Sequence, residues 1–266
     1  MIVQVSNLTK RYGDKTALDN ISFSIEAGEV VGLLGLNGAG KSTTMNILTG
    51  YISATSGTAT IGGFDITSDG SKAKRLIGYL PELPAFYPEI RVNEHLAFIC
   101  GIKGVYKDKK ARQEHIDDIC ARVGIADVKT RMIRNLSKGY RQRVGFAQAL
   151  MGNPKVIILD EPTAGLDPSQ IIEMRNLIKS CGTNSTVIMS SHILSEIQTV
   201  CNRVIVINEG RLVADEDAES LTDGSSLEEV FMRIIGLGDR GTDGSTSENT
   251  SASSSGSTDD ITRETL

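Results

Sequence analysis

The sequence lacks the features that mark several classes of protein. None of its apolar runs approaches the roughly 20 residues that a membrane-spanning helix needs, and its N-terminus has neither the charged region nor the apolar core of a secretory signal. Lysine and arginine form no cluster of the kind that contacts nucleic acid. These absences predict a protein that is soluble by itself, does not bind nucleic acid and reaches a membrane only through a partner.

Paired cysteines are also missing. The four cysteines lie far apart and form no Cys-x-x-Cys motif; they are Cys100, Cys120, Cys181 and Cys201. Such spacing argues against a disulfide framework or a cysteine metal site, and it predicts reduced, mostly buried thiols in a cytosolic protein.

The charge is concentrated at the C-terminal end. Residues 239–266 hold six acidic and two basic side chains, so they contribute −4 to the net charge of −5 and leave −1 for the rest. More than half of the residues after Gly238 are Gly, Ser or Thr, which cannot bury enough apolar surface to offset their chain entropy. We therefore expect one folded unit over 1–238 and a disordered acidic tail over 239–266, with a tail that orders on a partner as the alternative.

A glycine-rich stretch between a buried apolar run and a helical segment is the strongest motif. It fits the phosphate-binding pattern G-x-x-x-x-G-K-[ST] and consists of Gly35, Leu36, Asn37, Gly38, Ala39, Gly40, Lys41, Ser42 and Thr43. The glycines let backbone N–H groups approach phosphate oxygens, and the following helix N-terminus favours an anion. Lys41 supplies a positive charge to the terminal phosphates, and the Ser42 hydroxyl is a ligand that Mg²⁺ accepts.

A pair of carboxylates ends another buried apolar run. Asp160 and Glu161 follow Val156–Leu159 directly. A phosphate loop needs a carboxylate for its metal, so Asp160 is predicted to hold Mg²⁺ directly or through water. Glu161, one residue further, is predicted to act as the general base on the attacking water.

The order of apolar patterns predicts an α/β fold. Short antiparallel strands are expected over 2–8 and 21–25, and strands alternating with helices predict a parallel sheet. A helical subdomain is expected over about 84–152, where helical periodicity dominates. The other expected strands are 57–63, 76–80, 156–159, 186–189 and 204–207; the expected helices are 41–48, 168–180 (with Asp167 as N-cap), 193–200 and 227–235.

Five further segments resemble those of the ATP-binding cassette (ABC) ATPases, and they occur in the order that the family has. Leu136–Arg143 is similar to the family signature: Ser137 and Gly139 agree with it, whereas Lys138 and Tyr140 stand where Gly and Gln are common. The resemblance implies that this segment binds the γ-phosphate held by a second subunit. It also implies a P-loop NTPase core with a parallel sheet, an N-terminal antiparallel β subdomain and an inserted helical subdomain.

The resemblance assigns roles to four more residues. Tyr12 is similar to the aromatic that stacks on adenine, and Asp167 lies in a segment similar to the D-loop that links two sites of a dimer. His192 resembles the switch histidine that senses the γ-phosphate. Glu82 stands where the family usually has a glutamine that touches Mg²⁺, so this copy adds a carboxylate there.

These residues together predict an ATPase subunit of a transporter. The resemblance implies a homo- or heterodimer that binds ATP and Mg²⁺, drives a separate transmembrane permease, favours export, and lies at the cytoplasmic face of the cell membrane. A cassette ATPase that acts on ribosomes or DNA is the main alternative. A GTPase or small-molecule kinase is a third hypothesis, although no Asn-Lys-x-Asp tetrapeptide is present to read guanine.

Overall fold

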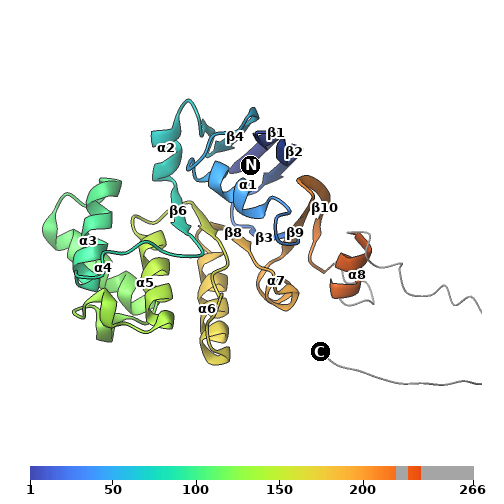
Figure 1. The fold of residues 1–266 in the computed structure, drawn as a ribbon. Coiled ribbons are helices and arrows are strands. Elements are labelled where there is room, and N and C mark those ends of the chain that lie inside the picture. Colours follow the sequence, from blue (N-terminus) through green and yellow to red (C-terminus); the bar gives the residue numbers. More distant parts are fainter. Residues whose placement is uncertain (220–226, 235–266) are drawn as a thin grey trace, which may run out of the picture.

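The computed structural model describes residues 1–219 and 227–234, and Figure 1 shows how their elements are arranged. The four strands of the N-terminal sheet lie in the order β2-β1-β4-β5, and every pair is antiparallel. They are β1 (Val3–Tyr12), β2 (Lys15–Ile25), β4 (Ser56–Ile61) and β5 (Phe64–Asp65). The expected antiparallel pairing is present, but β1 and β2 are longer than expected: the hairpin continues to Tyr12 and Lys15, with irregularities in register along the way.

A six-stranded sheet forms the centre of the fold in the order β10-β9-β3-β8-β7-β6. Five of its strands run parallel: β3 (Val30–Leu34), β6 (Ile77–Leu80), β7 (Val156–Leu159), β8 (Thr186–Ser190) and β9 (Arg203–Asn208). The parallel sheet is therefore confirmed. The edge strand β10 (Arg211–Asp217) runs antiparallel to β9 and was not expected.

Alternate residues of the central strands serve two separate cores. Val31 and Leu33 of β3 belong to a cluster with α1 (Lys41–Leu48) and the N-terminal sheet, whereas Val30 and Leu34 face the other cluster. This second cluster is formed with α5 (Lys138–Leu150), α6 (Pro168–Cys181), α7 (Leu194–Val200) and α8 (Leu227–Ile234). A parallel sheet covered on both faces explains why its strands read as continuous apolar runs.

Three helices follow one another between β6 and β7, although these two strands are neighbours in the sheet. They are α3 (Val92–Lys103), α4 (Lys109–Arg122) and α5, with the short 3₁₀ helices η1 (Ala126–Val128) and η2 (Ile133–Asn135) before α5. In Figure 1 this group lies to one side of the sheet, away from the N-terminal strands. The helices expected within 84–152 are thus present, and Asp108 caps α4 through the backbone N–H of Ala111.

A few elements differ from the expectation or lie outside it. The six-residue helix α2 (Gly70–Arg75) was not predicted, because its sequence is too short and polar to show a period. All four cysteines are buried and unpaired. No helix in the described ranges has the length and apolar character to cross a bilayer. The expected tail over 239–266 lies outside the described residues.

Candidate nucleotide site

The phosphate loop lies where the sequence predicts it, between β3 and α1. Gly40 occupies the N-cap of α1 with φ of 119°, a conformation that favours glycine. A Cβ on Gly35 would lie 2.2 Å from the carbonyl oxygen of Ile207, so β9 leaves no room for a side chain at that position. The loop is therefore fixed by both backbone conformation and close packing.

Lys41 is buried at the start of α1 and folds back over the loop. Its Nζ donates to the carbonyl oxygen of Gly35 at 2.6 Å and to that of Leu36 at 3.2 Å. Burial lowers the pKa of Lys41, while the nearby carboxylates of Glu161 and Asp160 act in the opposite direction. The ammonium group is thus held above the loop, where phosphate oxygens can replace the two carbonyl groups as its acceptors.

The two acidic residues after β7 are joined to the end of β8 by one serine. The Ser190 hydroxyl donates to Asp160 Oδ1 at 2.6 Å and accepts from the backbone N–H of Glu161 at 3.0 Å. Asp160 is buried, whereas Glu161 has a left-handed backbone with φ of 48°. That conformation is unfavourable for a residue with a side chain, and strain of this kind is typical of functional sites.

His192 lies directly beside Glu161. The distance between His192 Nδ1 and Glu161 Oε2 is 2.7 Å, and the histidine side chain is 58% exposed while that of Glu161 is 14% exposed. A carboxylate oriented by an imidazole at hydrogen-bond distance can accept a proton from water. The geometry of this pair is thus compatible with the general-base role expected for Glu161.

Lys41, Glu161 and His192 line one hollow of about 420 Å³. Its lining consists of Tyr12, Lys15, Ala17, Asn37, Gly38, Gly40, Lys41, Ser42, Thr43, Glu82, Glu161, Ala164 and His192. The structure thus brings together residues from five separate parts of the sequence that were assigned to nucleotide, metal or catalysis. Gly35, Leu36, Ala39 and Asp160 lie in adjoining segments rather than in the lining itself.

Tyr12 lies at the mouth of this hollow with about half of its side chain exposed (51%). The Lys10 ammonium group is 4.9 Å from the centre of the ring and is held by the carbonyl oxygen of Ser53 at 2.8 Å. Lys15, which pairs with Tyr12 across the β1–β2 turn, also lines the hollow and was missed. The sequence could have predicted Lys15 from its position three residues after Tyr12, across a Gly-Asp turn.

Side chains with oxygen atoms suited to Mg²⁺ lie in the hollow and in the segment beside it. Ser42 and Glu82 line the hollow, and Asp160 has one oxygen fixed by Ser190. Within the described chain, no three His, Cys, Asp or Glu side chains are grouped so as to hold a metal by themselves. This set fits Mg²⁺, which uses one or two protein oxygens, substrate phosphates and water rather than a protein cage.

The signature residues lie elsewhere. The lining of the hollow includes none of the four described residues 137–140. Ser137 caps α5 by accepting from the backbone N–H of Tyr140 at 3.4 Å, and the Tyr140 hydroxyl donates to Asp127 at 3.0 Å. The action of this segment on a nucleotide bound by another subunit stays a prediction.

The signature instead contacts the D-loop segment of its own chain. A Cβ on Gly139 would lie 2.4 Å from the Gln170 side chain, and the Lys138 ammonium group lies against Gly165. Asp167 occupies the N-cap position of α6, but its side chain makes no capping hydrogen bond. Gly139 thus lies against the end of the Gln170 side chain, a contact within the chain that the motif alone did not predict.

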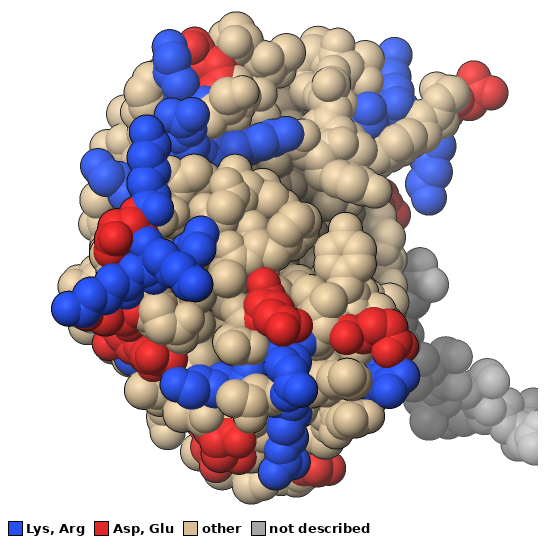
Figure 2. Space-filling model, turned by 90° about the vertical axis from the view of Figure 1, so that its left-hand side faces the viewer, with Lys and Arg blue, Asp and Glu red and all other residues tan. Residues whose placement is uncertain are grey.

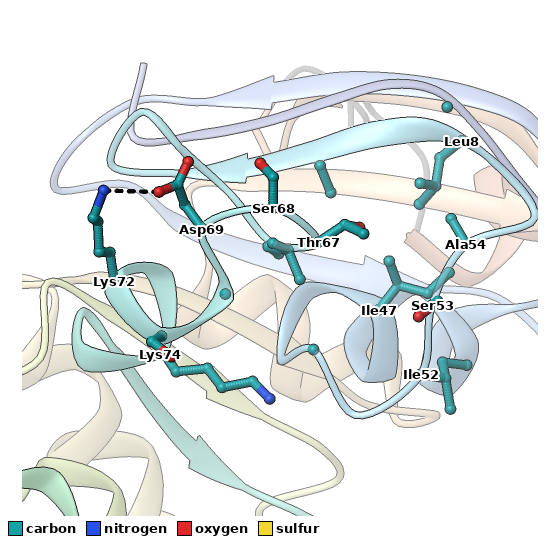
Figure 3. A pocket seen from close by; sticks show the side chains of 16 residues that line it. Leu8, Ile47, Ile52, Ser53, Ala54, Thr67, Ser68, Asp69, Lys72 and Lys74 are labelled. Carbon is teal, nitrogen blue, oxygen red and sulfur yellow. Dashed lines mark hydrogen bonds and ion pairs between the residues drawn. The ribbon is translucent and has the colours of Figure 1, made fainter.

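A second, larger hollow of about 580 Å³ lies at the other end of α1. Figure 3 shows its lining, with the ion pair between Lys72 and Asp69 (2.8 Å) at its edge. None of the predicted site residues lines it.

On the face drawn in Figure 2, basic side chains gather mainly along one edge, with acidic side chains among them.

Comparison with known proteins places these features in a family. The family described as "ABC transporter" matches residues 18–164. The chain is 38% identical over 216 residues to the bacitracin transport ATP-binding protein BcrA of Bacillus licheniformis, covering 80% of this chain and 69% of that one. It is 36% identical over 236 residues to the lantibiotic transport ATP-binding protein SrtF of Streptococcus pyogenes, covering 88% and 97%.

Solved structures agree with this assignment. The ATP-binding subunit of an ABC transporter matches with a TM-score of 0.80 and 26% identity, over 88% of this chain and 99% of the other. A dimeric cassette, MJ0796, solved in a post-hydrolysis state with ADP and phosphate, matches with a TM-score of 0.74 and 25% identity, over 81% and 98%.

Proposed function

Since this chain belongs to the ABC transporter family, as an ATPase subunit that binds and hydrolyses ATP, we propose which of its residues act on the nucleotide and what the subunit drives. The observation that carries the proposal is the single hollow in which the phosphate loop faces the Glu161–His192 pair. Tyr12 stacks on the adenine there. The loop N–H groups and Lys41 bind the phosphates.

Glu161 is the proposed general base. It takes a proton from water as the water oxygen attacks the γ-phosphorus and the bond to the bridging oxygen of ADP breaks, releasing ADP and phosphate. His192 orients Glu161 and contacts the γ-phosphate. Ser42, Asp160 and Glu82 would hold Mg²⁺, which neutralises developing charge on the phosphate oxygens.

One chain supplies half of each site. Ser137 and Gly139 lie outside the hollow of their own chain, which supports a head-to-tail dimer in which they bind the γ-phosphate of the partner subunit. Lys138 and Tyr140 belong to the same segment, and Asp167 belongs to the proposed D-loop. ATP binding closes this dimer, and hydrolysis opens it again.

The cycle drives a separate transmembrane permease, and we assign the direction as export. Relatives named for transport of bacitracin and of a lantibiotic support this assignment. The subunit then works at the cytoplasmic face of the cell membrane, held there by the permease.

A trapping experiment tests the proposal. Tagged Glu161→Gln is loaded with ATP in cells, membranes are solubilised gently, and co-purifying proteins are identified by mass spectrometry. We expect a multi-spanning membrane protein that is absent when the tagged chain is Lys41→Ala. Recovery of ribosomes or DNA instead would replace the transport role by the non-transport alternative, while the ATPase chemistry would stand.

A further inference from the structure

A fully buried carboxylate lies behind the nucleotide hollow and is not part of its lining. Glu196, in the first turn of α7, has no solvent-exposed surface (0%). Its Oε2 accepts from the Thr163 hydroxyl at 2.6 Å and from the Ser191 hydroxyl at 2.9 Å. One oxygen atom therefore joins two loops that leave different strands, β7 and β8.

The two hydroxyl groups belong to the segments that carry the Glu161–His192 pair. Thr163 follows Glu161 by two residues, and Ser191 directly precedes His192. Ser191 Oγ also accepts from the backbone N–H of Ile193 at 3.0 Å, which fixes the turn that contains His192. Thr163 begins the turn toward the D-loop, since its carbonyl oxygen accepts from the N–H of Leu166 at 3.1 Å.

The other oxygen of Glu196 is poorly satisfied. Arg175 Nη2 of α6 is 3.6 Å from Oε1, and both Glu196 Oε1 and Arg175 Nε are buried without a hydrogen-bond partner in the described chain. Burying a carboxylate is costly, and an apolar side chain of similar size is often equally stable or better. Stability alone does not explain a carboxylate at this position, whereas its two hydroxyl contacts give it a positional role.

We infer that Glu196 is a positioning residue of the ATPase reaction: through Thr163 and Ser191 it fixes the Glu161–His192 pair and couples the D-loop segment to it. The inference rests on the proposed roles of Glu161 and His192. Glu196 itself touches no nucleotide. Because small displacements of a reacting group reduce rates by up to about 100-fold, loosening either loop is expected to slow turnover more than it weakens binding.

Four variants of the full chain test this assignment. Thr163→Val and Ser191→Ala each remove one hydroxyl and leave the other hydroxyl and Arg175 beside Glu196, so we expect the fold to be retained. Glu196→Leu removes both contacts, and Glu196→Gln keeps one acceptor oxygen. The matched control is Thr199→Val on the same helix, since the Thr199 hydroxyl bonds only to the carbonyl oxygen of Ser195 in its own turn.

Steady-state ATPase kinetics, nucleotide binding and thermal melting are measured for each. We expect kcat to fall by roughly 10- to 100-fold in Thr163→Val, Ser191→Ala and Glu196→Leu, with KM for ATP within about threefold of the parent. Glu196→Gln should recover most of the kcat lost in Glu196→Leu, and Thr199→Val should match the parent. The double variant Thr163→Val/Ser191→Ala should lose less than the product of the single losses, because both hydroxyl groups act through one carboxylate.

Two results would overturn the inference. One is a kcat at the parental level in both hydroxyl variants; the other is a loss of kcat that follows the loss of melting temperature across all variants, Glu196→Gln included. Failure of the underlying site assignment looks different. In that case Lys41→Ala and Glu161→Gln, run in the same assay, would themselves retain parental turnover.

Discussion

Two hollows lie at opposite ends of helix α1, and the larger one is not the predicted nucleotide site. The hollow at the helix N-terminus measures about 420 Å³ and contains Lys41, Glu161 and His192. The hollow at the C-terminal end measures about 580 Å³ and is lined by Ile47, Ile52 and short polar side chains. A choice of cavity by volume alone would therefore pick the end of α1 that lies away from the phosphate loop.

The difference between the two ends is electrostatic. The N-terminus of α1 presents free backbone N–H groups and the positive end of the helix dipole, which favour phosphate. At the C-terminal end α1 presents the negative end of its dipole, and the hollow is lined by Lys72, which is paired with Asp69 at 2.8 Å, and by Lys74. A cavity is therefore identified as the nucleotide site by the groups that converge on it rather than by its size.

The strongest test of this contrast removes one lysine from each end. Lys41→Ala should lower kcat/KM for ATP on the order of 10³-fold, because it removes the buried positive charge above the loop. Lys74→Ala, at the other end of α1, should leave kcat/KM unchanged. Phosphate release assays on both proteins measure this, and equal losses would mean that the loop does not distinguish the two hollows.

A second test separates binding from chemistry within the smaller hollow. Glu161→Gln should bind ATP and dimerise, but its kcat should fall on the order of 100-fold or more, because an amide cannot accept the proton from water. Glu209→Gln is the control, since Glu209 has a similar left-handed backbone (φ 47°) in an exposed turn. Gel filtration with ATP and single-turnover assays report the two steps; near-parental hydrolysis would remove Glu161 as the base.

A third test concerns the mouth of the smaller hollow. Tyr12→Ala should weaken ATP binding by about 1–3 kcal/mol through loss of ring stacking, whereas Tyr12→Phe should bind like the parent. Tyr51→Ala, an exposed tyrosine beyond the C-terminal end of α1 (79% exposed), is the control. Titration with a fluorescent ATP analogue measures all three, and parental affinity in Tyr12→Ala would remove the ring from the adenine site.

The smallest effect is expected at the larger hollow. Lys72→Ala breaks an ion pair whose side chains are 63% and 40% exposed, so the free energy of unfolding should change by less than about 1 kcal/mol. ATPase activity should remain at the parental level. Urea denaturation and a turnover assay check both; a clear loss of turnover would show that the two hollows communicate along α1.

The sequence predicted the parallel strands, the phosphate loop and α1 closely because each has a strong local signal. The loop pattern fixes its own position, and buried strands such as Val156–Leu159 are continuous apolar runs. β10 and α2 were missed because Arg211–Asp217 and Gly70–Arg75 are mostly polar, and their structure depends on neighbours that local periodicity does not report.

The candidate site also divides into residues with a local sequence signal and residues whose role depends on contacts in the fold. Four residues lie together as expected, because each belongs to a segment that resembles a motif of the family: Tyr12, Lys41, Glu161 and His192. Lys15 and the buried contacts of Glu196 were not foreseen, because they depend on which loops meet in space. Roles that reside in a motif could be predicted from sequence, whereas roles that reside in contacts between loops required the structure.

The left-handed backbone of Glu161 has an evolutionary consequence. At φ of 48°, glycine or asparagine is the less strained residue, by roughly 1 kcal/mol or more. A library at position 161 selected only for thermal survival should therefore enrich Gly and Asn, while one selected for growth that depends on transport should return Glu. The two selections would drive the same codon in opposite directions, so we expect glutamate to persist at this position only under selection for turnover.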